Sequence, residues 1–332
     1  MPIITVPQDF NTDDLFVDLR RFAGRSLYLK CEGFNFAGSI KIKAARSMVA
    51  AAERRGDLRP GSTLVESSSG NLGVALSLVA ASSGYRFVCV TDSRCTLGAR
   101  QLMETLGAEV RIVTEPHPEH GLLGARIELV KQLCAERGHV WLNQYENAGN
   151  WRAHYETTGP QIAGGFPDAG VVFIGAGTTG TLMGCARYLR EHQPATRVVA
   201  IDTVGSVTFG TPPARRMIPG LGTGIRPPML DLAYVDDVVH VEEADTVRAC
   251  RALTRAGFCF GGSTGTVVSG ALAWLAGHEE IGTAVAIAPD LGDRYLDTVY
   301  HDQWVADLYG EELLEDGLLE DGTAIQPTGP GR

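Results

Sequence analysis

The sequence has no block of basic residues, and its acidic residues outnumber the basic ones to give a formal net charge of −10 at pH 7. This charge balance does not suit binding to nucleic acid or to an anionic membrane surface. No apolar run is long enough to cross a bilayer, and the first residues, MPIITVPQDF, lack the basic start and apolar core of a signal peptide. We therefore expect a cytoplasmic protein with neither nucleic acid nor a membrane as a partner.

Cysteine pairs and metal-binding clusters are also scarce. The seven cysteines are scattered, and no C-x-x-C pair occurs. This pattern is typical of free thiols in a reducing compartment and argues against a disulfide framework or a cysteine-based zinc site. The HPEH run at residues 117–120 could indicate a metal site, but a polar loop between two elements explains it better. We expect no metal.

The sequence does contain a regular alternation of short apolar runs and helix-like segments. The runs read STLVES, YRFVCVT, AEVRIVT, VWLN, GVVFIG, RVVAIDT and AVAIAP in chain order. Strands that alternate with helices predict an α/β protein with mostly parallel sheets flanked by helices. The runs fall into two blocks, which indicates two domains packed around a cleft. We assign residues 35–150 to a smaller N-terminal domain, residues 1–34 and 151–310 to a larger domain, and residues 311–332 to an acidic, weakly ordered tail.

A glycine-rich turn joins one of these runs to a helix-like segment. In VVFIGAGTTGTLMG, Gly175, Gly177 and Gly180 form the G-x-G-x-x-G fingerprint of dinucleotide-binding proteins, and Asp202 ends the next apolar run. The pattern requires only that backbone N–H groups approach an anion at a helix N-terminus. Its position in the middle of the chain and the threonines at 178, 179 and 181 favour a compact terminal phosphate. A nicotinamide-dependent oxidoreductase and a purely structural turn remain alternatives at this point.

A lysine stands at the start of a long amphipathic helix predicted from GSIKIKAARSMVAAAERRG. Ser39 is a plausible N-cap, which places Lys41 in the first turn. The positive end of the helix dipole disfavours a second positive charge there and lowers the pKa of the lysine, so the amine becomes a better nucleophile. A functional and a solvated Lys41 are equally consistent with this segment alone, whereas Lys43 is better explained as a solvated lysine.

Two further loops are rich in hydroxyl groups. Residues 67–71, Ser-Ser-Ser-Gly-Asn, lie where a strand turns into a strongly apolar helix, and hydroxyls with free N–H groups at a helix start suit a carboxylate. Four such polar side chains exceed what a helix cap needs, and the Asn71 amide can also meet a phenolate or a carbonyl. Ser263 and Thr264 follow FCFGG before another helix, and this pair alone indicates only a cap.

Taken together, these segments resemble one known arrangement. A lysine in S-x-K, an SSSGN loop, a GTTGT loop and a late GGSTG turn occur as in the cysteine synthase family, the fold-type-II enzymes that depend on pyridoxal 5′-phosphate (PLP). NQYENAGNWRAHYETTGPQI is similar to the connecting loop of that family, and the resemblance covers residues 9–305. It implies two α/β domains with the cofactor in the cleft between them, and a homodimer. The anion at the glycine loop is then the PLP phosphate, and the dinucleotide match is incidental.

The resemblance also implies a role for each matching residue. Lys41 corresponds to the lysine that holds PLP as a Schiff base and later removes the α-proton of the substrate. Asn71 corresponds to the residue bonded to the ring hydroxyl, and Ser263 to the residue that faces the pyridine nitrogen. The residues that match the phosphate-binding loop are Gly177, Thr178, Thr179, Gly180 and Thr181. The residues that match the substrate-carboxylate loop are Ser67, Ser68, Ser69, Gly70 and Asn71, with Gln144.

The implied reaction is a β-replacement. A serine at the pyridine nitrogen cannot enforce protonation of the ring, which favours loss of a β-leaving group followed by attack of a nucleophile at Cβ. Two features depart from ordinary cysteine synthases, namely the segment KCEGFNFAGSIKIKAA and Leu72 at a position where threonine is usual. In both, the sequence is most similar to the branch of the family that supplies 2,3-diaminopropionate to siderophores and peptide antibiotics. In that branch, O-phospho-L-serine loses phosphate and L-glutamate adds, which gives N-(2-amino-2-carboxyethyl)-L-glutamate. The resemblance therefore implies a PLP-dependent transferase that acts on small amino-acid substrates.

Both substrates of that branch are polyanions, so an acidic protein must place cations in its cleft. Arg126 in GLLGARIELV is the first candidate, with Tyr145 beside Gln144 as a hydroxyl donor. The weaker candidates flank the loop MIPGLGTGIRPP and are Arg215, Arg216 and Arg226. A surface role remains an alternative for each arginine.

Three other functions stay open. A cysteine synthase would use sulfide with O-acetylserine or O-phosphoserine. A nicotinamide-dependent oxidoreductase is what the glycine fingerprint alone would favour. A non-catalytic protein with the PLP fold is the third, and an intact Lys41 argues against it.

Overall fold

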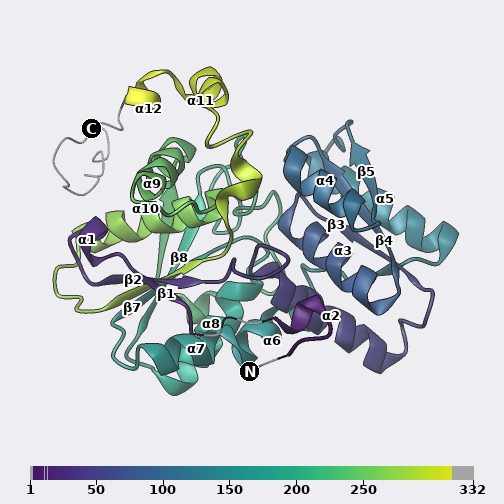
Figure 1. Cartoon of the computed structure of the whole chain (residues 1–332), viewed down its shortest axis with the longest axis horizontal. Helices are drawn as coiled ribbons and strands as arrows, with labels where there is room; N and C mark the ends of the chain where they lie inside the picture. Colours follow the sequence, from purple (N-terminus) through teal and green to yellow (C-terminus); the bar gives the residue numbers. More distant parts are fainter. Residues whose placement is uncertain (1–2, 11, 13, 316–332) are drawn as a thin grey trace.

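The computed structural model describes residues 3–10, 12 and 14–315 of the 332-residue chain. Two β-sheets lie in two lobes that stand side by side (Figure 1), one with four strands and one with six. The predicted α/β class, with mostly parallel sheets flanked by helices, is confirmed. The domain boundaries at residues 34, 150 and 310 stay a prediction.

The smaller sheet is built from one continuous stretch of chain. Its strands are β3 (Thr63–Ser67), β4 (Arg86–Asp92), β5 (Glu109–Val113) and β6 (Val140–Trp141), all parallel and in the order β5-β4-β3-β6. The connecting helices are α3 (Asn71–Ser83), α4 (Leu97–Thr105) and α5 (Gly121–Arg137). Leu64 and Phe87 pack against the core that includes α3, whereas Val65 and Val88 pack against α5. Both faces of β3 and β4 are thus buried, which explains why these two strands are nearly continuous apolar runs.

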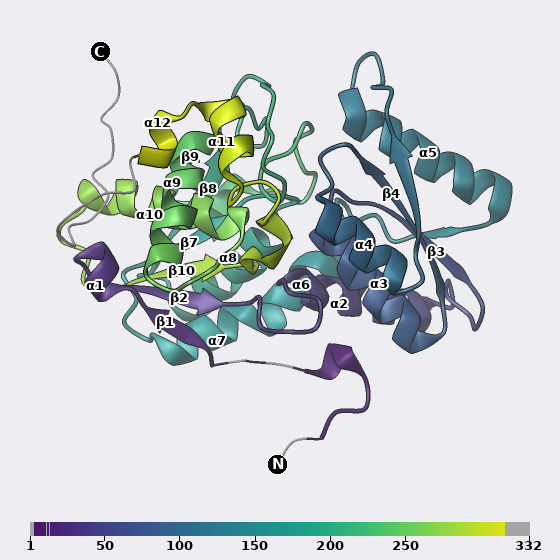
Figure 2. The same cartoon turned by 45° about the horizontal axis from the view of Figure 1, so that its top comes forward.

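The larger sheet joins the two ends of the chain. Its strands are β1 (Phe16–Asp18), β2 (Leu27–Cys31), β7 (Val171–Gly175), β8 (Arg197–Thr203), β9 (Asp237–Val241) and β10 (Ala284–Ala288), in the order β1-β2-β10-β7-β8-β9. The pairing of β1 with β2 is antiparallel, and the other pairs are parallel. The helices α9 (Glu243–Arg255) and α10 (Gly262–Ala276) lie on the opposite face of this sheet from α7 (Thr158–Gly165) and α8 (Gly180–His192), as Figure 2 shows.

Two helices connect the lobes. Helix α2 (Lys41–Arg55) packs against α3 of the smaller lobe and against α6 (Ala148–Glu156), which in turn packs against α8 of the larger lobe. The short elements are η1 (Pro7–Asp9), α1 (Arg20–Ala23), η2 (Leu232–Tyr234), η3 (Gly292–Tyr295), α11 (Asp302–Tyr309) and α12 (Glu312–Glu315). Of the predicted acidic tail, the described part forms α12, in which Leu313 is buried. Residues 316–332 lie outside the described residues.

All seven apolar runs predicted as strands are strands in the structure, whereas β1, β2 and β9 were not predicted. β1 has three residues, β2 contains Lys30, and β9 begins with Asp237 and contains His240. Such short or charged segments give no clear apolar signal. Within the described part of the chain, no helix has the length and apolar character that crossing a membrane requires.

Candidate functional site

A cleft of about 890 Å³ lies between the two lobes. It is lined by residues that follow the carboxyl ends of strands from both sheets, which is where open α/β sheets bind ligands. The cleft brings together every residue predicted for the cofactor and the substrate: Lys41, Ser67, Ser68, Ser69, Gly70, Asn71, Arg126, Gln144, Tyr145, Gly177, Thr178, Thr179, Gly180, Thr181 and Ser263. Of the weaker arginine candidates, Arg215 and Arg216 line it, and the exposed Arg226 does not.

Lys41 is the first residue of α2 and points its amine into this cleft region. Burial lowers its pKa to about 8, although the nearby Asp290 carboxylate opposes the shift. The prediction that Ser39 caps this helix is wrong. Ile40 holds the N-cap position, and the buried Ser39 hydroxyl has no hydrogen-bond partner among the described residues.

The loop of residues 67–71 connects β3 to α3 at the cleft wall. Ser68 Oγ accepts hydrogen bonds from the backbone N–H groups of Gly70 (3.2 Å) and Gly73 (2.9 Å) and so ties down the start of α3. Ser67 Oγ is buried and has no hydrogen-bond partner among the described residues. One serine therefore ties down the helix start, and the Ser67 hydroxyl is available to a ligand.

A buried carboxylate holds this loop against the predicted residue Gln144. Glu66 accepts hydrogen bonds from Trp141 Nε1 (2.9 Å) and from the backbone N–H groups of Ser67 (2.9 Å) and Gln144 (3.2 Å). The Gln144 amide donates to the Ser67 carbonyl at 2.8 Å. Burial raises the pKa of Glu66 to about 7. Glu66 was not predicted as a site residue, because a glutamate inside an apolar strand gives no sign in the sequence that it supports a loop.

The Asn71 amide is oriented from both sides. Its Nδ2 donates to Asp290 Oδ2 at 3.0 Å, and its Oδ1 accepts from Arg294 Nη1 at 3.0 Å. One hydrogen of the amide remains for a ligand in the cleft. Asp290 and Arg294 were also missed by the sequence analysis. Their position directly after the last apolar run, AVAIAP, is a signal that could have identified them, because ligand sites gather at the carboxyl ends of parallel strands.

Ser263 is buried near the start of α10. Its hydroxyl is hydrogen-bonded to that of Tyr295, which also donates to Asp290 Oδ2 at 2.6 Å. Burial and the Asp290 charge raise the pKa of Tyr295 well above its usual value, so its hydroxyl stays protonated. Ser263 is therefore held by a neutral neighbour rather than by an ionised one.

The glycine-rich loop at the start of α8 has the features of an anion site. Thr179, a β-branched residue, adopts the left-handed conformation with φ 64°, which such residues rarely do. Its Oγ1 is buried without a hydrogen-bond partner among the described residues, while Thr178 Oγ1 accepts from Asn150 Nδ2 at 3.0 Å. A Cβ atom on Gly177 would lie 2.9 Å from the Gly220 carbonyl oxygen. The loop thus presents a free hydroxyl and helix N-terminal N–H groups to the cleft.

A cluster of arginines faces the other end of the cleft. Arg126 is 4% exposed, and its Nε lies 3.3 Å from Asp92 Oδ2. Arg94 binds the same carboxylate through Nε (3.0 Å) and Nη2 (2.8 Å). Burial alone would raise the pKa of Asp92, but hydrogen bonds from Arg94 and the charge of Arg126 lower it. One carboxylate shared by two guanidinium groups leaves a net positive charge.

Arg216 and Tyr145 extend this cluster. Burial and the positive charge of Arg94 lower the pKa of Arg216, whose Nη1 donates to the Leu221 carbonyl at 3.0 Å. Burial also raises the pKa of Tyr145, which therefore remains a hydroxyl donor. Arg215 lines the same wall but is exposed. Arg94 was not predicted as a site residue, although it lies two residues after the end of strand β4.

Two other predictions concern residues outside the cluster formed by Arg94, Arg126 and Arg216. The interpretation of Lys43 as a solvated lysine is wrong: its side chain is 12% exposed and its Nζ lies 2.8 Å from Glu32 Oε1. In the HPEH segment, His117 Nδ1 accepts hydrogen bonds from the backbone N–H groups of Glu119 and His120, as expected of a polar turn. Within the described ranges, no three His, Cys, Asp or Glu side chains gather as a metal site would require.

The chemistry of these groups fits PLP. The free Thr179 hydroxyl and the N-terminus of α8 suit a phosphate, and the Asn71 amide keeps one hydrogen for the ring hydroxyl. A lysine with a lowered pKa stands in the same cleft and can attack an aldehyde. Ser263 supplies a neutral hydroxyl to a ring nitrogen.

Comparison with known proteins agrees with this fit. Residues 14–290 match the model of a family described as "pyridoxal-phosphate dependent enzyme". The chain is 40% identical to the N-(2-amino-2-carboxyethyl)-L-glutamate synthase of Ralstonia nicotianae over 292 residues, and this alignment covers 86% of each chain. It is 38% identical to the synthase of the same name from Cupriavidus metallidurans over 300 residues, and this alignment covers 87% of this chain and 88% of the relative.

Solved structures lead to the same family. An O-ureido-L-serine synthase superimposes with a TM-score of 0.84 at 34% identity and covers 93% of this chain and 97% of its own. An O-acetylserine-dependent cystathionine β-synthase from Helicobacter pylori superimposes with a TM-score of 0.82 at 28% identity and covers 91% of this chain and 100% of its own. The predicted cofactor and the predicted enzyme class are thereby confirmed, and the oxidoreductase alternative is not supported. The chain belongs to the family of pyridoxal-phosphate-dependent enzymes.

Proposed function

We propose that this enzyme replaces the phosphate of O-phospho-L-serine with the amino group of L-glutamate and so forms N-(2-amino-2-carboxyethyl)-L-glutamate. The observation that carries this proposal is the cation cluster of Arg94, Arg126 and Arg216 in the same cleft as Lys41. A dianionic leaving group and a dicarboxylate nucleophile both need such partners, whereas sulfide does not. The names of the two curated relatives support the same reaction.

The predicted cofactor residues take the following places in this proposal. Gly177, Thr178, Thr179, Gly180 and Thr181 hold the cofactor phosphate, Asn71 binds the ring hydroxyl, and Ser263 faces the ring nitrogen. Lys41 would hold the cofactor covalently through its amine. Bound PLP supplies an electron-withdrawing ring that makes the α-proton of an attached amino acid acidic.

The substrate is positioned by groups of the smaller lobe. Residues 67–71 and Gln144 bind its carboxylate through N–H, hydroxyl and amide donors. The Lys41 amine would remove the α-proton of the substrate. A pKa of about 8 keeps a useful fraction of its amine uncharged near neutral pH. Arg126 and Tyr145 bind the leaving phosphate, and Arg94 and Arg216 add the positive charge that later attracts glutamate.

A sulfide-using cysteine synthase is the second candidate. The solved relatives are named for O-ureido-L-serine and for cystathionine, so closely related folds accept different nucleophiles. In such an enzyme, the buried Arg126 and the half-buried Arg94 at Asp92 would have no anion to bind after the leaving group departs. The cation cluster therefore favours the dicarboxylate.

We further infer a cytoplasmic homodimer that supplies 2,3-diaminopropionate to a siderophore or a peptide antibiotic. The dimer follows from the resemblance to the cysteine synthase family. All seven cysteines are free thiols, which suits a reducing compartment. Light scattering of the purified protein would check the dimer.

The function is tested with purified enzyme and O-phospho-L-serine. In the presence of glutamate, phosphate release should continue through many turnovers, and mass spectrometry should detect N-(2-amino-2-carboxyethyl)-L-glutamate. A matched reaction with sulfide should give cysteine much more slowly. If cysteine accumulates faster than the glutamate adduct, the enzyme is a cysteine synthase and the proposal is wrong.

A further inference from the structure

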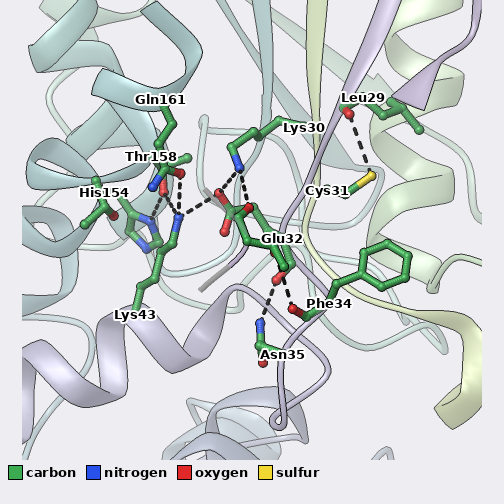
Figure 3. Close-up of polar contacts among 12 residues, drawn as sticks. Leu29, Lys30, Cys31, Glu32, Phe34, Asn35, Lys43, His154, Thr158 and Gln161 are labelled. Atoms are coloured by element: carbon green, nitrogen blue, oxygen red, sulfur yellow. Dashed lines mark hydrogen bonds and ion pairs between the residues drawn. The ribbon is translucent and has the colours of Figure 1, made fainter. Parts of the chain in front are cut away.

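A second polar centre is formed by Lys30, Glu32 and Lys43 (Figure 3). We call these three residues the charge cluster. Lys30 Nζ lies 3.4 Å and Lys43 Nζ 2.8 Å from Glu32 Oε1, and the three side chains are 0%, 5% and 12% exposed. None of the three lines the cleft. Two ammonium groups that share one carboxylate away from water need further acceptors, and those of Lys43 lead toward the cofactor site.

A chain of hydrogen bonds runs from Lys43 to the glycine-rich loop. Lys43 Nζ donates to Thr158 Oγ1 at 3.1 Å and to Gln161 Oε1 at 3.0 Å (Figure 3). Thr158 Oγ1 lies 3.1 Å from His154 Nδ1, and His154 Nε2 lies 3.2 Å from Thr181 Oγ1. Thr181 lines the cleft, whereas the other four residues do not. The imidazole of His154 thus connects the charge cluster to the predicted phosphate site.

Close packing of two helices maintains the contact between His154 and Thr181. His154 lies on α6 and Thr181 on α8, and Gly184 follows Thr181 by one helical turn. A Cβ atom on Gly184 would lie 2.6 Å from the Cβ of His154. Because Gly184 has no side chain, α6 approaches α8 closely enough for His154 Nε2 to reach Thr181. His154 and Thr158 are 1% and 0% exposed, so solvent does not compete for their hydrogen bonds.

Lys43 fixes which group donates and which accepts in each of these hydrogen bonds. An ammonium group can only donate, so Thr158 Oγ1 accepts from Lys43 and has its own proton available for His154 Nδ1. Nδ1 then accepts, and the proton of a neutral ring sits on Nε2, which donates to Thr181 Oγ1. The Thr181 hydroxyl proton is left for an acceptor in the cleft.

We propose that Lys43 is a positioning residue, which through Thr158 and His154 selects the ring tautomer that makes the Thr181 hydroxyl a donor to the cofactor phosphate. This role rests on the proposed function in one respect, namely that the phosphate is bound by residues 177–181. The ring is neutral, as the proposal requires. Burial, with the charges of Lys43 and Lys41, lowers the pKa of His154 well below its usual value.

Removal of Lys43 would release this constraint. A proton on Nδ1 could then be donated to Thr158 Oγ1, and Nε2 would become an acceptor. Thr181 would turn its proton toward His154 and present a lone pair to the phosphate. A hydrogen bond to a charged group would be lost, which corresponds to about a tenfold change in affinity.

The test compares two buried lysines of the same cluster. Lys43→Met and Lys30→Met each remove one partner of Glu32, but Lys43 is the lysine that bonds to Thr158. Titration of each apoprotein with PLP should show about tenfold weaker binding for Lys43→Met, with a changed ³¹P chemical shift of the bound phosphate. Lys30→Met should bind PLP within about twofold of the wild type, although both variants lose thermal stability. Lys43→Arg keeps a donor-only cation and should restore affinity.

Two further measurements separate this role from a merely structural one. Lys43→Met should add no loss of PLP affinity in a Thr181→Val background, because both changes remove the same hydrogen bond. In the unmodified holoenzyme, ¹⁵N NMR should find the proton of His154 on Nε2, which decides the matter even if Lys43→Met does not fold. Equal weakening by the two lysine variants, additive effects with Thr181→Val, or a proton on Nδ1 would each overturn the proposal. A wild-type apoprotein that binds no PLP would instead refute the proposed function, and this role with it.

Discussion

Arg126→Met should weaken the binding of an anionic leaving group and leave the other steps of catalysis intact. The Arg126 side chain is almost fully buried, and its Nη1 has no hydrogen-bond partner among the described residues, so it is available to the substrate phosphate. A charge-assisted hydrogen bond contributes about 1.5–3 kcal/mol, which corresponds to about ten- to hundredfold in kcat/KM. Methionine keeps much of the apolar volume and removes the charge.

The fold should tolerate this change. Breaking a buried ion pair typically costs about 3–5 kcal/mol because a charge is left without a partner. Asp92 keeps three hydrogen bonds from Arg94, two from the guanidinium group and one from the backbone N–H, so the loss of stability in Arg126→Met should be smaller than this. Arg137→Met is a matched control, since Arg137 lies on the same helix, α5, and is exposed. Its stability and activity should stay close to wild type.

The assay compares two leaving groups. Phosphate release from O-phospho-L-serine should fall about ten- to hundredfold in kcat/KM for Arg126→Met, whereas turnover of O-acetyl-L-serine, whose leaving group carries no second charge, should be nearly unchanged. PLP content should remain at the wild-type level. If both substrates lose activity equally, Arg126 acts on the structure of the cleft and not on the phosphate. If neither changes, another arginine binds the leaving group.

Three other predictions concern the cofactor. Lys41→Ala should abolish the absorbance of covalently held cofactor and all turnover, and peptide mapping after borohydride reduction should find the cofactor on Lys41 in the wild type; a label elsewhere would contradict the assignment. Gly177→Val should prevent PLP binding, measured by thermal stabilisation of the apoprotein, because its side chain would meet the Gly220 carbonyl. Because burial lowers the pKa of Lys41 to about 8, its amine is uncharged above that pH, so the rate of PLP uptake should rise up to about pH 8 and then level off; a rise that continues toward 10.5 would indicate an ordinary lysine.

The sequence predicted the parts of the site that are local in the chain. Loop 67–71, the glycine-rich loop and Lys41 each lie at the junction of a strand or loop with a helix, so their residue types carry the signal without knowledge of the fold. The role of Asp290 and Arg294 could not be found this way, because they orient an amide more than 200 positions earlier in the chain; the sequence shows only that they follow the last apolar run. Lys43 was misjudged for the same reason. Spacing places it two residues after Lys41, but only the fold brings Glu32 and Thr158 to its amine.

The pairing of β2 with β10 also sets the order in which the chain can fold during synthesis. All four strands of the smaller sheet lie between Thr63 and Trp141, so this lobe can form early on the ribosome. Leu27 of β2 pairs with Ala284 of β10, and ribosomes adding about 5–20 residues per second need roughly 10–50 s to make the intervening chain. Throughout that interval, the apolar strand β2 is protected along one edge by β1 and exposes the other. Ribosomes that stop before β10 would therefore release chains with a folded smaller lobe and an open, aggregation-prone strand edge.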